Sequence, residues 1–114
     1  MPIQYEDTNA NIRLIKISGR LDIPGTGEIE GKFAALAATD KHPVVVDLTE
    51  VSFLASIGIR AIITNAKAQL QRGGKMVLFV GDNAGVAKTL QMTGIDSLVP
   101  MFGDIGEATA AVAA

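Results

Sequence analysis

The stretch from residue 44 to residue 60 constrains the fold more than any other part of the chain. It opens with Val44-Val45-Val46, a β-branched run without polar alternation, which is typical of a central strand covered on both faces. A polar corner from Asp47 to Ala55 follows, and beyond Ser56 the apolar residues recur with helical spacing. This order predicts a buried strand, a corner and a long amphipathic helix, with Ser56 at the start of the helix.

Two roles suit Ser56 at this junction. A hydroxyl placed just before a helix can accept a hydrogen bond from a free backbone N–H group and so cap the helix. The same N–H groups and the helix dipole would also stabilise a phosphate carried on that hydroxyl. The local sequence leaves both roles open.

The helix after Ser56 has a predicted buried stripe, whose members recur at intervals of four, three and four residues: Ile59, Ile63, Ala66 and Leu70. Arg60 lies off this stripe. Gly73-Gly74 is expected to end the helix, because a left-handed cap favours a residue without a side chain.

The segments before residue 44 predict a hairpin followed by a helix. Alternating apolar residues indicate two strands within residues 3 to 18, and Gly19-Arg20-Leu21-Asp22 is expected to break the second strand. Thr26 is the predicted cap of a helix that ends near Thr39 and buries one face: Ile29, Phe33 and Leu36.

The segments after residue 74 predict a further strand and two helices. Residues 76 to 80 form a second continuous apolar run, and Asp82 or Asn83 is expected to cap a helix that carries Val86, Leu90 and Met92 and closes at Gly94. A short strand is expected within residues 95 to 101. Asp104 and Glu107 resemble a capping box before an Ala-rich terminal helix.

These elements predict an α/β fold, with a mixed central sheet of four to five strands and about four helices, in a single domain over residues 1 to 114. The strand order is left open. A formal charge of -2 and the absence of tryptophan disfavour a nucleic-acid surface. The N-terminus lacks a secretion signal, and no stretch is apolar enough for membrane insertion, so we expect a cytoplasmic protein.

Hydrolase chemistry at Ser56 is disfavoured. A nucleophile elbow needs a small residue two positions before the serine, and Leu54 stands there. His42 is the single histidine of the chain, and it precedes Pro43 at the opposite end of the predicted strand. The predicted strand therefore lies between Ser56, the candidate nucleophile, and His42, the candidate base.

Phosphate-loop and metal sites are also disfavoured. Gly73-Gly74-Lys75 lacks the glycine and hydroxyl residues of a nucleotide-binding loop, because Gln69 and Met76 stand at those positions. The chain has no cysteine, which excludes thiol catalysis and cysteine-ligated metals. Three aspartates that follow strands could approach one rim of the sheet, although caps and loops explain them better: Asp22, Asp47 and Asp82. We expect no enzymatic activity, no metal and no cofactor.

Apolar residues flank Ser56 and suggest a surface for a protein partner. Phe53 is expected to pack inside, whereas Ile57 in the first helical turn suits either packing or partner contact. Met92, Met101 and Phe102 are expected to fill the core or an edge.

The segment from Asp47 to Arg60 resembles the signature of STAS domains, especially that of bacterial anti-sigma factor antagonists. Three further pieces in the same order extend the resemblance over nearly the whole chain: Gly19 to Asp22, Arg72 to Lys75 and Thr93 to Asp96. Alignment of the family glycine with Gly58 places Ser56 at the phosphoacceptor position.

The resemblance implies a partner-switching cycle. The unmodified protein would bind an anti-sigma factor that is also a serine kinase, phosphorylation of Ser56 would release it, and a serine phosphatase would reset the switch. The implied partner-binding residues surround the phosphoacceptor: Asp22, Phe53, Leu54, Ala55, Ser56, Ile57, Gly58 and Arg60.

Two positions depart from the family pattern. Ala55 stands where an aspartate is usual, and Ile57 stands where a second hydroxyl is common. The alternative implied by these departures is a STAS module of a transporter or signalling assembly, which binds a protein or small ligand without being phosphorylated.

Overall fold

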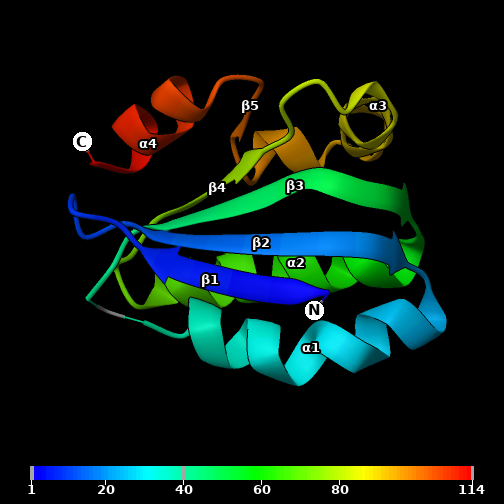
Figure 1. The fold of residues 1–114 in the computed structure, drawn as a ribbon, viewed down its shortest axis with the longest axis horizontal. Helices are drawn as coiled ribbons and strands as arrows, with labels where there is room; N and C mark the ends of the chain where they lie inside the picture. Colours follow the sequence, from blue (N-terminus) through cyan, green and yellow to red (C-terminus); the bar gives the residue numbers. More distant parts are fainter. Residues whose placement is uncertain (1, 40, 114) are drawn as a thin grey trace.

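A five-stranded mixed sheet runs through the middle of the molecule, with helices on both of its faces (Figure 1). The computed structural model describes residues 2–39 and 41–113. In chain order the elements are β1 (Ile3–Asp7), β2 (Arg13–Leu21), α1 (Ile23–Ala37), β3 (Val44–Leu54), α2 (Ser56–Gln71), β4 (Met76–Phe79), α3 (Ala84–Thr93), the 3₁₀ turn η1 (Ile95–Ser97), β5 (Met101–Phe102) and α4 (Ile105–Ala113). The α/β class expected from the sequence is confirmed.

The strands lie in the order β1-β2-β3-β4-β5. β1 and β2 form the predicted antiparallel hairpin, and the remaining neighbours are parallel. Parallel pairing places the C-terminal ends of β2 and β3 at the same end of the sheet. This end carries the residues around Ser56.

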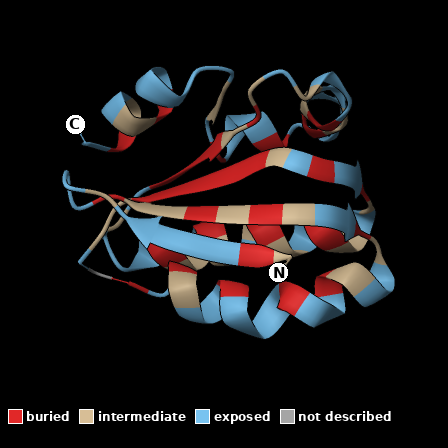
Figure 2. Cartoon of the chain, in the orientation of Figure 1, coloured by how far each residue is buried: buried red, intermediate tan, exposed pale blue. Residues whose placement is uncertain are grey.

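β3 is buried along its first half (Figure 2). Val44 and Val46 face the larger core under α1 and α2, whereas Val45 faces a smaller core that Val77 and Val112 complete from β4 and α4. Successive strand residues point to opposite faces, so a strand covered on both sides shows no polar alternation. This confirms the prediction of a central strand.

The predicted corner after Asp47 is wrong, and so is the break at Gly19. β3 continues to Leu54 and β2 continues to Leu21, because the two strands remain paired across register shifts near Gly19. Gly19 adopts a φ of +88°, which accommodates the irregularity without ending the strand.

Asp22, rather than Thr26, caps α1. The Asp22 carboxylate accepts a hydrogen bond from the Gly25 N–H at 2.9 Å, and Pro24 suits the first helical turn because its missing donor is not needed there. Thr26 is instead buried inside the helix, which ends at Ala37 with its C-cap at Ala38, close to the predicted end near Thr39.

The buried stripe of α2 differs from the prediction. Ile59 and Ala66 are buried as expected, but Ile62 and Gln69 take the remaining core positions. Leu70 is 53% exposed and Ile63 is half-buried. The actual stripe is rotated relative to the predicted one, since α2 packs against the sheet and α1 together.

The C-terminal third follows the predicted order with changes of detail. Asn83 rather than Asp82 caps α3, Gly94 closes the helix in the left-handed conformation, and the last strand lies at residues 101–102. Met92 is 77% exposed, so its predicted packing role is wrong, whereas Met101 and Phe102 are half-buried edge residues. The Asp104 carboxylate accepts from the Glu107 N–H at 2.9 Å, as the capping motif predicts.

Candidate functional site

The C-terminal ends of β2 and β3 meet the N-termini of α1 and α2 at one end of the molecule. Arg20 is paired with Phe53, and Leu21 is paired with Leu54. The Ala55 N–H then donates to the Leu21 carbonyl at 3.1 Å, which ties the start of α2 to the end of β2. The structure therefore brings Asp22 together with the residues around Ser56.

Ser56 is the first residue of α2 and is exposed. The cap position belongs to Ala55, whose extended backbone has φ -88° and ψ 170° and whose side chain makes no capping hydrogen bond. Ser56 therefore does not cap α2, because the cap position lies one residue earlier, at Ala55. The first N–H groups of a helix have no acceptor inside that helix, so this helix start has donors and a dipole that suit a negative charge.

Gly58 sets how closely α2 approaches β2. A Cβ atom built on Gly58 would lie 2.8 Å from the Leu21 Cβ and 3.0 Å from the Leu54 Cδ1. Any larger residue would push the first turn of α2 away from the strand ends. Gly58 and Leu54 are both buried, so they support this surface from beneath rather than presenting side chains to a partner.

The exposed part of this end is rich in apolar side chains. Phe53 is 43% exposed, so its predicted packing is wrong, and Ile23 in the first turn of α1 is 74% exposed. Ile57 is half-buried and Arg60 is exposed. We call Ile23, Phe53, Ser56 and Ile57 the switch surface.

Arg20 links Asp22 to Phe53. Its guanidinium lies 4.5 Å from the centroid of the Phe53 ring, and its Nε donates to the Asp22 Oδ2 at 3.1 Å. The Gly25 N–H and, secondarily, Arg20 hold the pKa of the Asp22 carboxyl below its ordinary value because both stabilise the charged form. Asp22 thus remains an anion that orders the first turn of α1 and the Arg20 side chain.

Sequence reasoning missed Arg20 and Ile23 as members of this surface. The pairing of Arg20 with Phe53 depends on the register between β2 and β3, which local patterns do not encode. Ile23 could have been found if Asp22 had been read as the cap, since the next residue would then start a helix at the surface.

A groove of about 290 Å³ continues from the switch surface between α1 and α2. Its lining includes the small Ala34 and Ala61 and the charged Glu30 and Arg60. Ile57 contributes to both the groove and the switch surface. A partner that covered Ser56 would therefore have an adjoining recess for its own side chains.

The structure separates Ser56 from the single histidine. His42 precedes β3 and Ser56 follows it, so the eleven residues of the strand lie between them and place them at opposite ends of the sheet. The His42 Nδ1 lies 2.9 Å from the Asn11 carbonyl oxygen, at the far end of the sheet. This arrangement does not assemble a catalytic triad.

The three aspartates considered for a metal site have local partners or stand apart. Asp22 caps α1, and the Asp47 Oδ1 accepts from the Thr49 N–H and hydroxyl at 2.9 and 2.7 Å. Within residues 2–39 and 41–113, no three carboxylate or histidine side chains gather where a metal ion could bind. Gly74 belongs to the end of α2, where its N–H donates to the Gln69 carbonyl at 2.9 Å.

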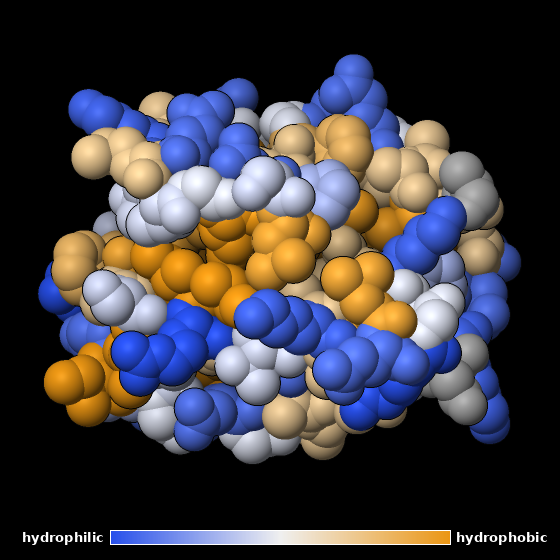
Figure 3. Space-filling model, turned by 180° about the vertical axis from the view of Figure 1, so that it is seen from behind, coloured by the Kyte–Doolittle hydropathy of each residue, from blue (hydrophilic) through white to orange (hydrophobic). Residues whose placement is uncertain are grey.

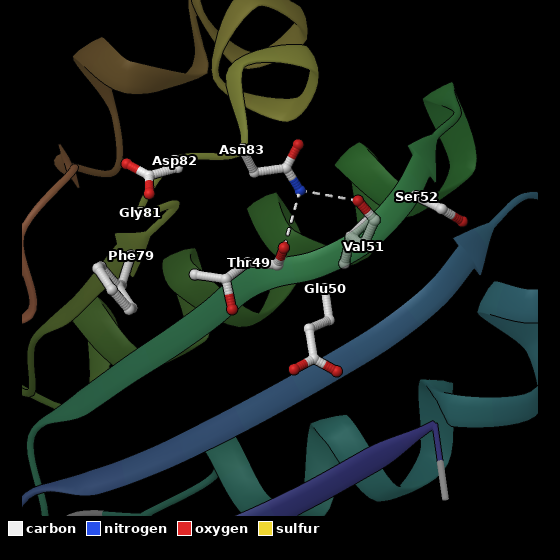
Figure 4. A pocket seen from close by; sticks show the side chains of 8 residues that line it. All are labelled: Thr49, Glu50, Val51, Ser52, Phe79, Gly81, Asp82 and Asn83. Atoms are coloured by element: carbon white, nitrogen blue, oxygen red, sulfur yellow. Dashed lines mark hydrogen bonds between the residues drawn. The ribbon is translucent and has the colours of Figure 1, made fainter.

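A second, open hollow of about 770 Å³ lies over the other face of the sheet, between β3 and the loop before α3 (Figure 4). Glu50, Phe79 and Asp82 line it. The Asn83 amide donates to the carbonyls of Leu48, Thr49 and Val51 at 3.0, 3.3 and 2.8 Å, respectively. These bonds anchor α3 on β3, so Asn83 has a structural role at this hollow.

In the part of the chain that the structure describes, no helix has the length and apolar character needed to cross a membrane.

Among curated proteins, the chain is similar to an anti-sigma-B factor antagonist of Staphylococcus epidermidis, with 26% identity over 85 residues, which is 75% of this chain and 78% of that protein.

Solved structures share the fold. An anti-sigma factor antagonist from Mycobacterium paratuberculosis superposes with a TM-score of 0.84 and 23% identity over 96% of this chain and 92% of that chain. The phosphorylated Bacillus cell fate determinant SpoIIAA superposes with a TM-score of 0.68 and 18% identity over 96% of this chain and 98% of that chain. Murine Slc26a9, an anion transporter, gives 0.74 and 17% identity over 89% of this chain and 17% of that chain.

A family model described as the STAS domain matches residues 6–108. This range includes all the strands except the first residues of β1, and it includes α1, α2 and the glycine turn after α2. The chain belongs to the STAS domain family.

Proposed function

We propose that this protein is a cytoplasmic anti-sigma factor antagonist that works by partner switching and has no catalytic activity of its own. The unmodified form binds an anti-sigma factor that is also a serine kinase, and phosphorylation of Ser56 ends that binding. A serine phosphatase restores the unmodified form. The observation that carries the proposal is the exposed Ser56 hydroxyl at the first position of α2, among the apolar side chains of the switch surface.

The position explains how a phosphate can act locally. Phosphoserine carries about -1.5 to -2 charge, and a helix N-terminus stabilises that charge, so the fold is expected to survive modification. The partner, however, must cover Ile23 and Phe53 beside the phosphate. Removing a dianion from water against an apolar surface is costly unless cations match it, so affinity falls without a large conformational change.

The direct test is incubation of the protein with ATP and its cognate anti-sigma kinase, followed by mass spectrometric mapping. We expect one phosphate on Ser56 and none on Ser52 or Ser97, which are also exposed serines. A label elsewhere, or no label with a kinase that binds the protein, would contradict the switch.

A second candidate function is that of an unswitched STAS module in a transporter or signalling assembly. Ala55 favours it, since the carboxylate usual next to the phosphoacceptor is missing and a kinase would meet a different surface. In that case the same surface would bind its partner equally well before and after exposure to serine kinases.

A further inference from the structure

An apolar groove of about 220 Å³ lies at the far end of α2, between this helix and the segment from η1 to β5. Its lining includes Ala66, Leu70, Met76, Leu98, Pro100 and Ala111. Figure 3 shows a band of hydrophobic side chains on the face that is hidden in Figure 1. Leu70 and Leu98 remain 53% and 37% exposed, respectively, so the walls of the groove hold large apolar side chains that the fold itself does not cover.

The α2 side of this groove is basic. Residues 61 to 81 contain Lys67, Arg72 and Lys75 and no acidic residue, although the whole chain carries a formal charge of -2. Lys67 lies one turn before Leu70 on α2, Arg72 follows the end of the helix, and Lys75 lines the groove. The opposite wall includes the uncharged Leu98, Pro100 and Ala111.

A second copy of this chain is the alternative occupant of the groove. A two-fold contact that packed α2 of one subunit against α2 of the other would bring Lys67 and Arg72 of both subunits together, and this like-charge contact disfavours such an arrangement. A partner with apolar side chains and an acidic flank would meet opposite charge along α2. The concave shape also matches the recurring mode in which an amphipathic helix lays its apolar face into a groove.

We propose that this groove binds an amphipathic helix of a protein partner, with apolar side chains between Leu70 and Leu98 and acidic side chains along Lys67 and Arg72. Leu70 is fourteen residues after Ser56 in the same helix, which corresponds to about 21 Å along the axis. The protein therefore has a second docking surface that is separate from the switch surface, and one helix carries both.

The test uses the full chain and three labelled helical peptides. The first has leucines on one face and glutamates along the flanks, the second replaces the glutamates with lysines, and the third keeps the composition of the first but scatters its leucines. Fluorescence anisotropy measures affinity, and ¹⁵N amide shifts locate the site. We expect the first peptide to bind about tenfold more tightly than the other two, with shifts centred on Leu70 and Leu98.

Variants separate the wall charges from the apolar contacts. Leu70→Asp and Lys67→Glu, both at exposed positions, should each weaken binding of the first peptide about tenfold. Ile105→Asp changes a 40% exposed isoleucine outside the groove and should leave this binding unchanged. Ser56→Asp should leave this binding unchanged, which makes the result independent of the proposed switch. Equal binding of the acidic and basic peptides, no binding of the first, or a dimer that Leu70→Asp dissociates would each overturn the proposal.

Discussion

The Ala55 N–H donates to the Leu21 carbonyl at 3.1 Å, which joins the start of α2 to the end of β2. The next residue on one side is Asp22, the cap of α1, and the next residue on the other side is Ser56. One backbone hydrogen bond thus sets two helix N-termini beside each other.

Charge at position 56 should control partner binding. We expect Ser56→Asp to weaken binding to the anti-sigma factor about tenfold or more, because the partner must then desolvate a carboxylate beside apolar residues. Ser56→Ala should bind normally and resist regulation. Calorimetric titration of both variants tests this, with Ser97→Asp as a control on another exposed serine, and equal affinities of the Asp and Ala variants would count against the mechanism.

Ile23 should matter for the partner but not for the fold. Its side chain is 74% exposed in the first turn of α1, so Ile23→Asp removes little packing and adds an acid where the helix dipole favours one. We expect an unchanged melting temperature and about tenfold weaker binding. Met92→Asp, an equally exposed apolar position on α3, serves as the control in the same titration.

Gly58→Ala should destabilise the protein by about 1–3 kcal/mol, because the added methyl group overlaps Leu21 and Leu54 and the surroundings must shift. Gly31→Ala in α1 is the matched control, since no heavy atom lies within 4 Å of its built Cβ. That change should be neutral or stabilising by up to about 1 kcal/mol. Urea unfolding of both variants tests this prediction. Similar changes in the free energy of unfolding would show that Gly58 does not set how closely α2 approaches β2.

Asn83 should contribute strongly to stability. Asn83→Ala removes the α3 cap and the side-chain amide that donates to the Leu48 and Val51 carbonyls of β3. We expect a loss of about 2 kcal/mol in the free energy of unfolding. Asn65→Ala, which removes one bond to Ala61 within α2, should change it by less than about 0.5 kcal/mol; a comparable loss in both would refute the anchoring role.

The stabilising effect of Asp22 should depend on pH. Its pKa in the folded protein lies below the ordinary value of 3.8, chiefly because of the Gly25 N–H. The charged form therefore stabilises the fold above the unfolded pKa, and this contribution disappears as the pH falls through the lower folded value. The stability difference between the wild type and Asp22→Ala should be constant near neutral pH and shrink in acid. A difference that stayed constant down to about pH 2 would contradict this assignment.

Much of the architecture could be predicted because it rests on local patterns. The continuous apolar runs in β3 and β4 indicated covered strands, the alternation in residues 3 to 18 indicated a hairpin, and Gly73 and Gly94 marked helix ends that need left-handed backbone. Each of these signals lies within a few residues of the element it predicts. The resemblance to STAS domains likewise depended on short segments in a particular order.

The site needed the tertiary structure at the points where pairing between distant residues decides the outcome. β3 extends to Leu54 because β2 pairs with it, and that extension moves the cap of α2 to Ala55 and leaves Ser56 as the first helical residue. The register places Arg20 over Phe53, and packing on two sides turns Leu70 outward. The sequence by itself determined that a serine begins a helix after a buried strand; only the assembled sheet decided that its hydroxyl does not cap that helix, because the hydrogen bonds and contacts responsible join residues far apart in the chain.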